Sequence, residues 1–335
     1  MKKTWLLLLL LIGLSILAVL VLRNKLSDEN TIDVSDRAFK IEEIDKIGKI
    51  FIAQKNNEPV TLTKENNVWL IEGKYKTNDI IISDLLGFFK NAQIKYIPPK
   101  AATKNIINEI AKIGTKVEVY NTSDELIRTF YVGGNTPDGR ATYFLMAGAD
   151  QPYVLEYPGQ DILLREKFLK KPMAWRSKMV FEENPENIVY AAMEYPKQKN
   201  LSFKIEKKDG KFTVNPFFEG VPKFTTELNQ NLAETYMQNF KSLGAEYLEN
   251  LNPRKDSINK LIPFATIYLE YENGGKKSMK LYPLLQVVNP NINEVELESL
   301  KKVERFYGQS SWGDFYLLQQ RLLLKYLRTY DYFYQ

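Results

Sequence analysis

The chain has 335 residues, 44% hydrophobic and 26% charged, a globular composition with room for two domains. It contains no Cys and no His, which excludes Cys and Ser-His nucleophiles, zinc sites built on these side chains, haem held by them, and disulfides. The net charge is +5, but Lys2, Lys3, Arg23 and Lys25 stand in a segment without acids, and the rest is nearly neutral. We therefore expect no nucleic acid as a partner, and predict no metal and no cofactor.

The first predicted element is an uncharged run from Trp5 to Leu22. As a helix it spans about 27 Å, close to the hydrocarbon core of a bilayer. A buried core helix would need a polar stripe, and a cleaved signal peptide would need small residues where Leu20, Val21 and Leu22 stand. We therefore expect residues 1–25 to be an uncleaved transmembrane anchor in the inner membrane, with an extracytoplasmic (periplasmic) body.

Residues 26–43 are polar and are expected to form a tether, and residues 44–178 a first α+β repeat. Apolar alternation predicts strands at 50–52, 60–62, 68–71, 94–97, 117–119, 127–132, 142–146 and 153–157. Helical spacing predicts helices at 79–93, 104–113 and 162–169, and the glycines predict a loop at 133–139.

Residues 179–335 show the same order of elements. Strands are expected at 189–191, 201–206, 212–214, 247–248, 267–271, 304–307 and 315–318, and helices at 226–243, 257–261 and 320–329. Phe89-Lys90-Asn91 matches Phe240-Lys241-Ser242 at a spacing of 151 residues, and Phe212 stands where the first half has Trp69. Chance similarity is the alternative, but the shared order favours two tandem, duplicated α+β domains with mainly antiparallel sheets and flanking helices.

Several of these segments together resemble one known family. They are Val68-Trp69-Leu70-Ile71 before a helix with Leu85-Leu86, Tyr131-Val132-Gly133-Gly134 with Pro137, then Tyr143 and Tyr153-Val154. In these residues and its N-terminal anchor, the chain is similar to the bacterial domain of unknown function 4340 family over most of residues 45–330. That family is uncharacterised and offers no catalytic residues to transfer. Some members are described beside ABC-type transporters linked to gliding motility, so the resemblance implies a membrane-associated accessory role.

One loop is a candidate binding site. Backbone N–H groups of a Gly-rich loop, with a neighbouring cation, suit an anion. The candidate residues are Gly133, Gly134, Asn135, Asp138 and Arg140. The alternative is an ordinary connection between strands, because Gly, Pro and Asn serve turn geometry and the stretch lacks the spacing of a P-loop.

Two further groups of charged residues are candidates for catalysis or for binding. Glu194, Glu270, Glu272 and Asp314 could supply the paired carboxylates of a glycoside hydrolase, but their neighbours favour solvent-facing strand positions. A basic stretch suits anionic lipid or an acidic partner, or else the end of a helix that links the two repeats. Its members are Lys167, Lys170, Lys171, Arg176 and Lys178.

The C-terminus is rich in aromatic residues, which suit either core packing or an exposed interface with a partner. Trp312, Tyr330, Tyr332 and Phe333 are the candidate partner surface, because little chain follows Tyr330 to cover it.

Taken together, these features favour a non-enzymatic, membrane-anchored scaffold or binding protein. Its expected partners are the membrane, through residues 1–25, and integral subunits of an envelope transport complex. A carboxylate-dependent hydrolase of envelope carbohydrate and a small-ligand binding protein with a site between the repeats remain as alternatives.

Overall fold

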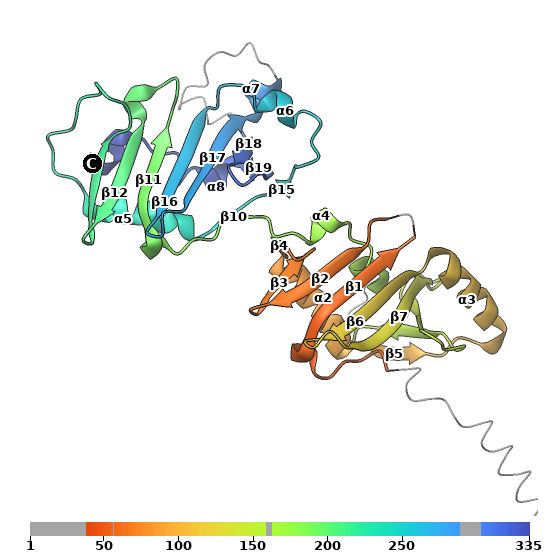
Figure 1. Ribbon diagram of the computed structural model, residues 1–335. Helices are drawn as coiled ribbons and strands as arrows, with labels where there is room; N and C mark the ends of the chain where they lie inside the picture. The colour runs from red at the N-terminus through yellow and green to blue at the C-terminus, as the bar shows by residue number, and fades with distance from the viewer. Residues whose placement is uncertain (1–37, 56, 159–162, 289–302) are drawn as a thin grey trace, which may run out of the picture. The chain divides into compact units, whose positions relative to one another are not determined.

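The computed structural model describes residues 38–55, 57–158, 163–288 and 303–335 (Figure 1). The expected anchor and most of the expected tether lie outside these residues. Within them, no helix combines the length and the apolar composition that crossing a membrane requires. The chain divides into two compact units, Met1–Ser177 and Lys178–Gln335, called unit 1 and unit 2 below.

Unit 1 is built on a nine-stranded antiparallel sheet with the order β4-β3-β2-β1-β6-β7-β8-β9-β5. Its strands are β1 (Ile47–Gln54), β2 (Val60–Glu65), β3 (Val68–Ile71), β4 (Tyr75–Lys76), β5 (Gln93–Tyr96), β6 (Thr115–Asn121), β7 (Leu126–Asn135), β8 (Thr142–Met146) and β9 (Tyr153–Glu156). Its helical segments are η2 (Ile44–Lys46), α2 (Asp79–Asn91), α3 (Lys100–Ile113), η3 (Leu164–Lys167) and α4 (Pro172–Trp175).

The two long helices of unit 1 have clear start and stop signals. The Asn78 side chain accepts hydrogen bonds from the backbone N–H groups of Ile80 and Ile81 and so caps α2. Helix α3 follows Pro99 directly and ends at Ile113, and the N–H of the next residue, Gly114, donates to the Ile110 carbonyl over 2.7 Å. The first turn of α3 therefore lies four residues earlier than the sequence pattern indicates, because that pattern counts only the apolar positions.

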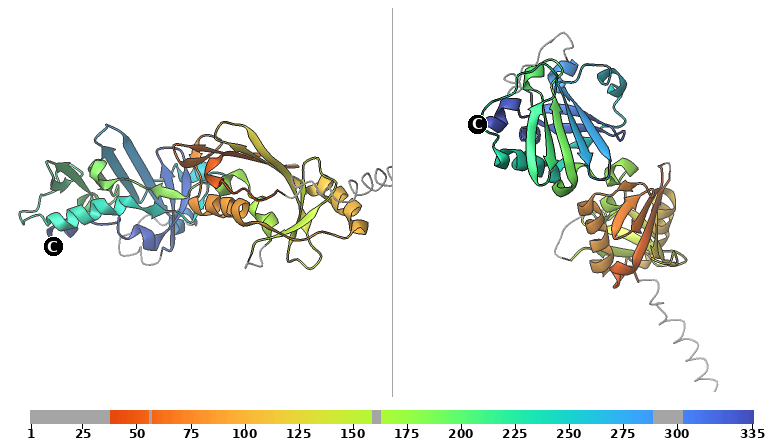
Figure 2. Two further views of the ribbon diagram at one scale, coloured as in Figure 1. Left: turned by 90° about the horizontal axis from the view of Figure 1, so that it is seen from below. Right: turned by 60° about the vertical axis from the view of Figure 1, so that its left-hand side comes forward.

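Helix α2 covers one face of the sheet, as the view from below in Figure 2 shows. Its Phe88 and Phe89 are fully buried and pack against Phe130 of β7. Phe39, which precedes the first strand, is only 2% exposed and contacts Phe130 as well. Phe39 and Ile41, from the segment expected to be a tether, thus pack in the core of unit 1.

Unit 2 contains an eight-stranded antiparallel sheet, β13-β12-β11-β16-β17-β18-β19-β15, and the short pair β10-β14. Its strands are β10 (Met179–Phe181), β11 (Ile188–Glu194), β12 (Phe203–Lys208), β13 (Lys211–Pro216), β14 (Leu243–Gly244), β15 (Tyr247–Leu248), β16 (Ala265–Tyr271), β17 (Lys276–Pro283), β18 (Arg305–Ser310) and β19 (Phe315–Gln319). Its helical segments are η4 (Pro185–Asn187), η5 (Lys199–Leu201), α5 (Gln230–Gln238), η6 (Asn239–Lys241), α6 (Lys255–Ile258), α7 (Leu284–Val288), α8 (Gln320–Leu323) and η8 (Tyr330–Tyr334).

The two sheets follow the same plan. Strands β3, β2, β1, β6, β7, β8, β9 and β5 correspond in order to β13, β12, β11, β16, β17, β18, β19 and β15. The pairing β1–β6 shifts register between Ile47 and Lys49, and β11–β16 shifts at the corresponding place, between Ile188 and Tyr190. Within this shared register, Trp69 and Phe212 occupy the same position opposite β2 and β12.

Three predicted elements are shorter in the structure. Of the helix expected at 162–169, the described residues from 163 onward form only η3, and a separate helix, α4, begins at Pro172. The helix expected at 226–243 begins at Gln230, where Asn229 caps it, and ends in η6. The helix expected at 320–329 stops after Leu323, and Tyr326 beyond it donates its hydroxyl hydrogen to the carbonyl of Asn239, the first residue of η6.

Candidate functional site

The predicted Gly-rich loop proves to be strand at its beginning. Gly133, Gly134 and Asn135 are the last residues of β7, at a bulge where β7 and β8 change register. A Cβ atom on Gly133 would lie 2.7 Å from Cγ1 of Ile110 in α3, and one on Gly134 would meet the carboxylate of Glu109. Both glycines are therefore explained by the close approach of α3 to β7.

The remaining loop residues bond mainly with one another. Oδ1 of Asp138 accepts from the Thr136 hydroxyl over 2.5 Å and from the Arg140 backbone N–H over 3.2 Å. The hydrogen bond from Thr136, followed by that from Arg140, lowers the pKa of Asp138. A carboxylate thus already accepts the loop's donors, an arrangement that opposes an anion and agrees with the turn interpretation. The exposed Arg140 side chain forms no ion pair with the described residues.

Arg165, which is not among the candidate residues of the sequence analysis, connects α3 to β7 at this end of unit 1. The guanidinium of Arg165, in η3, donates to the carbonyl of Gly133 and, over 3.0 Å, to the carbonyl of Ile113. Ile113 is the last residue of α3, where backbone carbonyls lack helical partners and a cation is favourable. Arg165 therefore fastens the C-terminal end of α3 to β7. In the sequence, the one signal for this role is that Arg165 stands in a stretch rich in basic residues that begins after residue 162.

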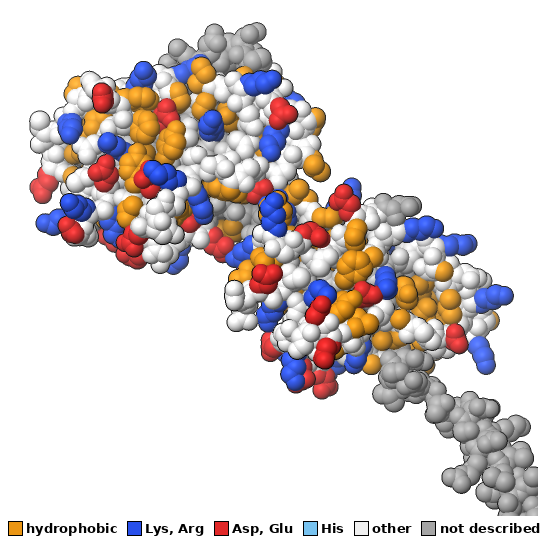
Figure 3. Space-filling view, in the orientation of Figure 1, with side chains coloured by type: hydrophobic (Ala, Val, Ile, Leu, Met, Phe, Trp, Pro, Cys, Tyr) orange, Lys and Arg blue, Asp and Glu red, His pale blue; other side chains and the backbone are white. Residues whose placement is uncertain are grey.

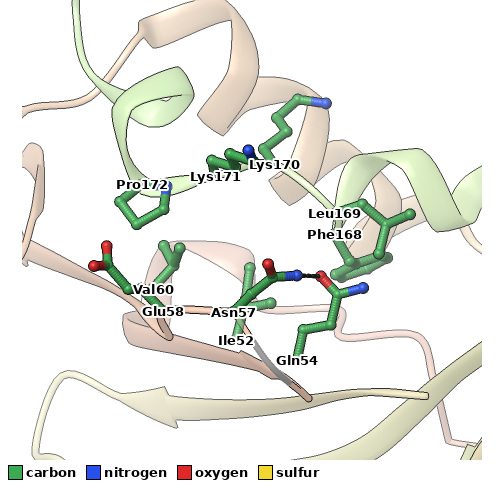
Figure 4. A pocket seen from close by; sticks show the side chains of 10 residues that line it. All are labelled: Ile52, Gln54, Asn57, Glu58, Val60, Phe168, Leu169, Lys170, Lys171 and Pro172. Carbon is green, nitrogen blue, oxygen red and sulfur yellow. Dashed lines mark hydrogen bonds between the residues drawn. The ribbon is translucent and has the colours of Figure 1, made fainter. Parts of the chain in front are cut away.

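A hollow of about 260 Å³ lies elsewhere on unit 1 (Figure 4). Its lining residues are Ile52, Gln54, Asn57, Glu58, Val60, Phe168, Leu169, Lys170, Lys171 and Pro172. The amide of Asn57 donates to that of Gln54 over 2.6 Å, and the Lys170 ammonium donates to the Glu166 carbonyl outside the lining. The hollow is smaller than ordinary ligand pockets of about 300–1,000 Å³, and half of its lining residues are apolar.

A second hollow, in unit 2, has a volume of about 510 Å³ and contains a tight charged cluster. The Lys277 ammonium pairs with Glu183 over 2.6 Å and lies 5.6 Å from the ring centroid of Tyr271 and 5.7 Å from that of Trp312. Burial, and then the neighbouring Glu183 carboxylate, raise the pKa of Tyr271. Lys277 therefore already occupies the position that a cationic ligand would take between these rings.

The expected C-terminal partner surface is largely core. Tyr330 is 2% exposed and Phe333 is fully buried, with the Phe333 ring centroid 4.7 Å from that of Phe203. Phe224, from the segment that follows β13, packs against Tyr330 and supplies the cover that the sequence did not reveal. Of the four residues named, Trp312 stays 39% exposed and Tyr332 is half-buried beneath Arg328.

The acids weighed for hydrolysis lie in separate environments. Glu194 accepts a 2.6 Å hydrogen bond from the Tyr268 hydroxyl, and Glu270 pairs with Lys276 over 2.6 Å. Asp314 is 8% exposed and accepts from the Asn250 amide over 2.8 Å, whereas Glu272 is exposed. Among the described residues, no group of three or more acids is placed to hold a metal ion.

The basic stretch serves the structure at several positions. Lys167 is 8% exposed and pairs with Asp84 of α2. The guanidinium of Arg176 stacks 3.5 Å above the ring centroid of Tyr75, and the Lys178 ammonium donates to the Glu246 carbonyl over 3.0 Å. The contacts of Lys167 and Arg176 lie within unit 1, and that of Lys178 lies within unit 2.

The fold and these sites define a protein with two α+β units, each built on an antiparallel sheet that follows one shared plan. The family described as Domain of unknown function (DUF4340) matches residues 69–258, more than half of the chain. The chain belongs to this family. The matched stretch runs from β3 of unit 1 to α6 of unit 2. No curated protein and no solved structure matches the chain.

Proposed function

We propose that this protein is a non-enzymatic scaffold or binding component that residues 1–25 anchor in the inner membrane. Its two units arose by internal duplication and stand on the extracytoplasmic side. There they serve as an accessory part of an ABC-type envelope transport complex.

The repeated sheet plan is the observation that carries this proposal. Corresponding positions keep the architecture but not the polar groups: the register places Glu194 where unit 1 has Ala53, and Glu270 where unit 1 has Tyr120. A duplicated domain that retains its core while its polar surface diverges favours recognition of different surfaces over a shared chemistry.

Copurification tests this function directly. The full-length protein is crosslinked mildly in its native membranes, solubilised in detergent and captured by affinity, and its companions are identified by mass spectrometry. Stoichiometric recovery of integral transporter subunits is the expected result. Recovery of the protein alone from several detergents would contradict the accessory role.

The membrane anchor is tested separately, by extraction of the same membranes with alkaline carbonate. We expect the full-length protein to stay in the pellet, and a variant that starts at residue 26 to be released. Release of both would remove the anchor from the proposal.

A further inference from the structure

The outer side of α3 in unit 1 carries lysines without acidic partners. Lys100, Lys104 and Lys112 are all exposed, whereas Ile106 and Ile110 of the same helix are buried against the sheet. At about 100° per residue, the three lysines fall within about 120° of one another, opposite the buried stripe. None of them forms an ion pair with any residue that the structure describes.

Exposed apolar side chains stand beside these lysines. Tyr96 and Ile97, just before the helix, are 43% and 46% exposed. Figure 3 shows Lys and Arg side chains gathered at the α3 end of unit 1 beside a hydrophobic area. Basic residues next to apolar and aromatic ones are typical of surfaces that lie in a membrane interface.

The acids nearest to these lysines do not neutralise their positive charge. Glu109 turns toward Gly134 at the side of the helix, and Asp138 accepts hydrogen bonds within its own loop. Asp138 keeps its negative charge, but Arg140 of the same loop offsets it, so the three lysines outnumber the remaining acid, Glu109. The surface is therefore complementary to negative charge.

The shared sheet plan does not require a helix of this length. The corresponding connection of unit 2, between β15 and β16, contains only the four-residue helix α6. In unit 1 the same connection holds the fourteen residues of α3. The basic helix is thus an elaboration of the unit that directly follows the N-terminal segment.

We propose that the α3 surface, made of Tyr96, Ile97, Lys100, Lys104 and Lys112, lies on an anionic lipid bilayer. This inference rests on the anchor of the proposed function. Residues 26–37 reach at most about 40 Å even when fully extended, so unit 1 stays close to any membrane that holds residues 1–25. Anionic lipids attract each lysine near the surface, and salt weakens the attraction.

The absence of native cysteine allows a single label to report this contact. The full-length Asn108→Cys protein, labelled with a fluorophore between the lysines, is placed in nanodiscs that contain a headgroup-nitroxide lipid as quencher. The discs consist of phosphatidylcholine alone or with about 30% phosphatidylglycerol. We expect about threefold stronger quenching in the anionic discs, reversed by high salt.

Charge variants carry the decisive comparison. Replacing Lys100, Lys104 and Lys112 by Glu should reduce quenching in anionic discs to the level of the neutral ones, and Gln replacements should have an intermediate effect. The matched control replaces the exposed Lys208, Lys211 and Lys260 of unit 2 by Glu and should leave quenching unchanged. Circular dichroism checks that each variant is folded.

The outcomes separate this inference from the anchor. If the protein stays with the discs but quenching does not depend on phosphatidylglycerol or on the three lysines, the α3 surface is not a lipid-binding face. If the protein fails to stay with neutral discs but quenching still requires anionic lipid, the anchor is wrong and the α3 surface stands.

Discussion

Gly133 and Gly134 are neighbours in β7, yet a methyl group would meet different surroundings at the two positions. At Gly133 it would lie 2.7 Å from Ile110 Cγ1 and 3.2 Å from the Tyr143 carbonyl oxygen, and both atoms belong to packed elements. At Gly134 it would meet the carboxylate end of Glu109, which can swing away into solvent. We therefore expect Gly133→Ala to lower the free energy of unfolding by about 1–3 kcal/mol, and Gly134→Ala by less than about 1 kcal/mol.

Urea denaturation of both variants measures this difference. The double variant Gly134→Ala with Glu109→Ala is the control, since it removes the side chain whose atoms lie nearest to the added methyl group. Equal destabilisation by the two glycine substitutions would contradict the packing account.

Tyr190 of β11 should make unit 2 sensitive to alkali. Burial, followed by the carboxylates of Glu270 and Glu206, raises the pKa of Tyr190 to about 12, whereas an unfolded tyrosine has a pKa of about 10. The folded protein therefore retains a proton that the unfolded chain loses. The resulting stabilisation is complete below about pH 10 and disappears as the pH rises toward 12.

The free energy of unfolding, measured by urea denaturation from about pH 9 to about pH 11.5, checks this expectation. It should fall less steeply with pH in Tyr190→Phe than in the unchanged protein. An unchanged slope in Tyr190→Phe would show that this hydroxyl does not contribute.

The outer edge of strand β13 is closed by side chains instead of another strand. The amide of Gln230 accepts from the N–H of Phe212 and donates to its carbonyl, each over 3.0 Å, as a neighbouring strand would. The Tyr334 hydroxyl donates to the Val214 carbonyl over 2.8 Å, and Pro216 has no N–H to offer. Edges blocked in this way resist pairing with other chains.

Opening this edge should promote self-association. We expect Gln230→Ala combined with Tyr334→Phe to form dimers and larger species at concentrations where the unchanged protein does not, because unpaired backbone groups become available. Size-exclusion chromatography with light scattering measures the effect. Gln238→Ala, at the other end of α5, is the control. A double variant that associates no more than this control would show that the edge is protected in another way.

The sequence predicted the strands well, because period-two alternation reports burial directly. The buried Ile50 and Ile52 of β1 illustrate this. The predicted equivalence of Phe212 and Trp69 is also seen in the register, where each pairs with the same position of its neighbouring strand, β12 or β2. Helix ends were less predictable, because tertiary contacts such as the hydrogen bond from Tyr326 to Asn239 decide them.

The candidate sites depended on contacts that sequence patterns do not contain. Gly133 suggested turn geometry, but its neighbour is Ile110 from a different element, and Phe333 suggested exposure because Phe203 and Phe224 lie far away in the chain. The lysines of α3 were visible in the sequence at spacings of four and eight residues, but their significance required knowing which side of the helix is buried.

Each hydrophobic cluster of the described residues draws on one unit only, which predicts that the two units unfold separately. Phe39 is 2% exposed, with its ring centroid 5.8 Å from that of Phe144 in the core of unit 1. Phe333 is fully buried in unit 2, 5.7 Å from Tyr236. Removing either ring should cost its own unit about 3–5 kcal/mol and leave the other unit unchanged.

Tryptophan fluorescence distinguishes the two transitions, since Trp175 is buried in unit 1 and Trp312 lies in unit 2. In urea, Phe39→Ala should lower the midpoint of the unfolding transition that Trp175 reports. The unfolding of unit 2 is followed in a Trp69→Phe, Trp175→Phe background, in which Trp312 remains, and Phe333→Ala should lower the midpoint of that transition. Leu251→Ala, at an 86% exposed position, should move neither by more than about 0.5 kcal/mol. If either phenylalanine substitution shifts both transitions equally, the units are coupled, and a load applied to one unit would then be felt by the other. Separate shifts instead mean that each unit keeps its own stability, so one can be remodelled by a partner while the other stays folded.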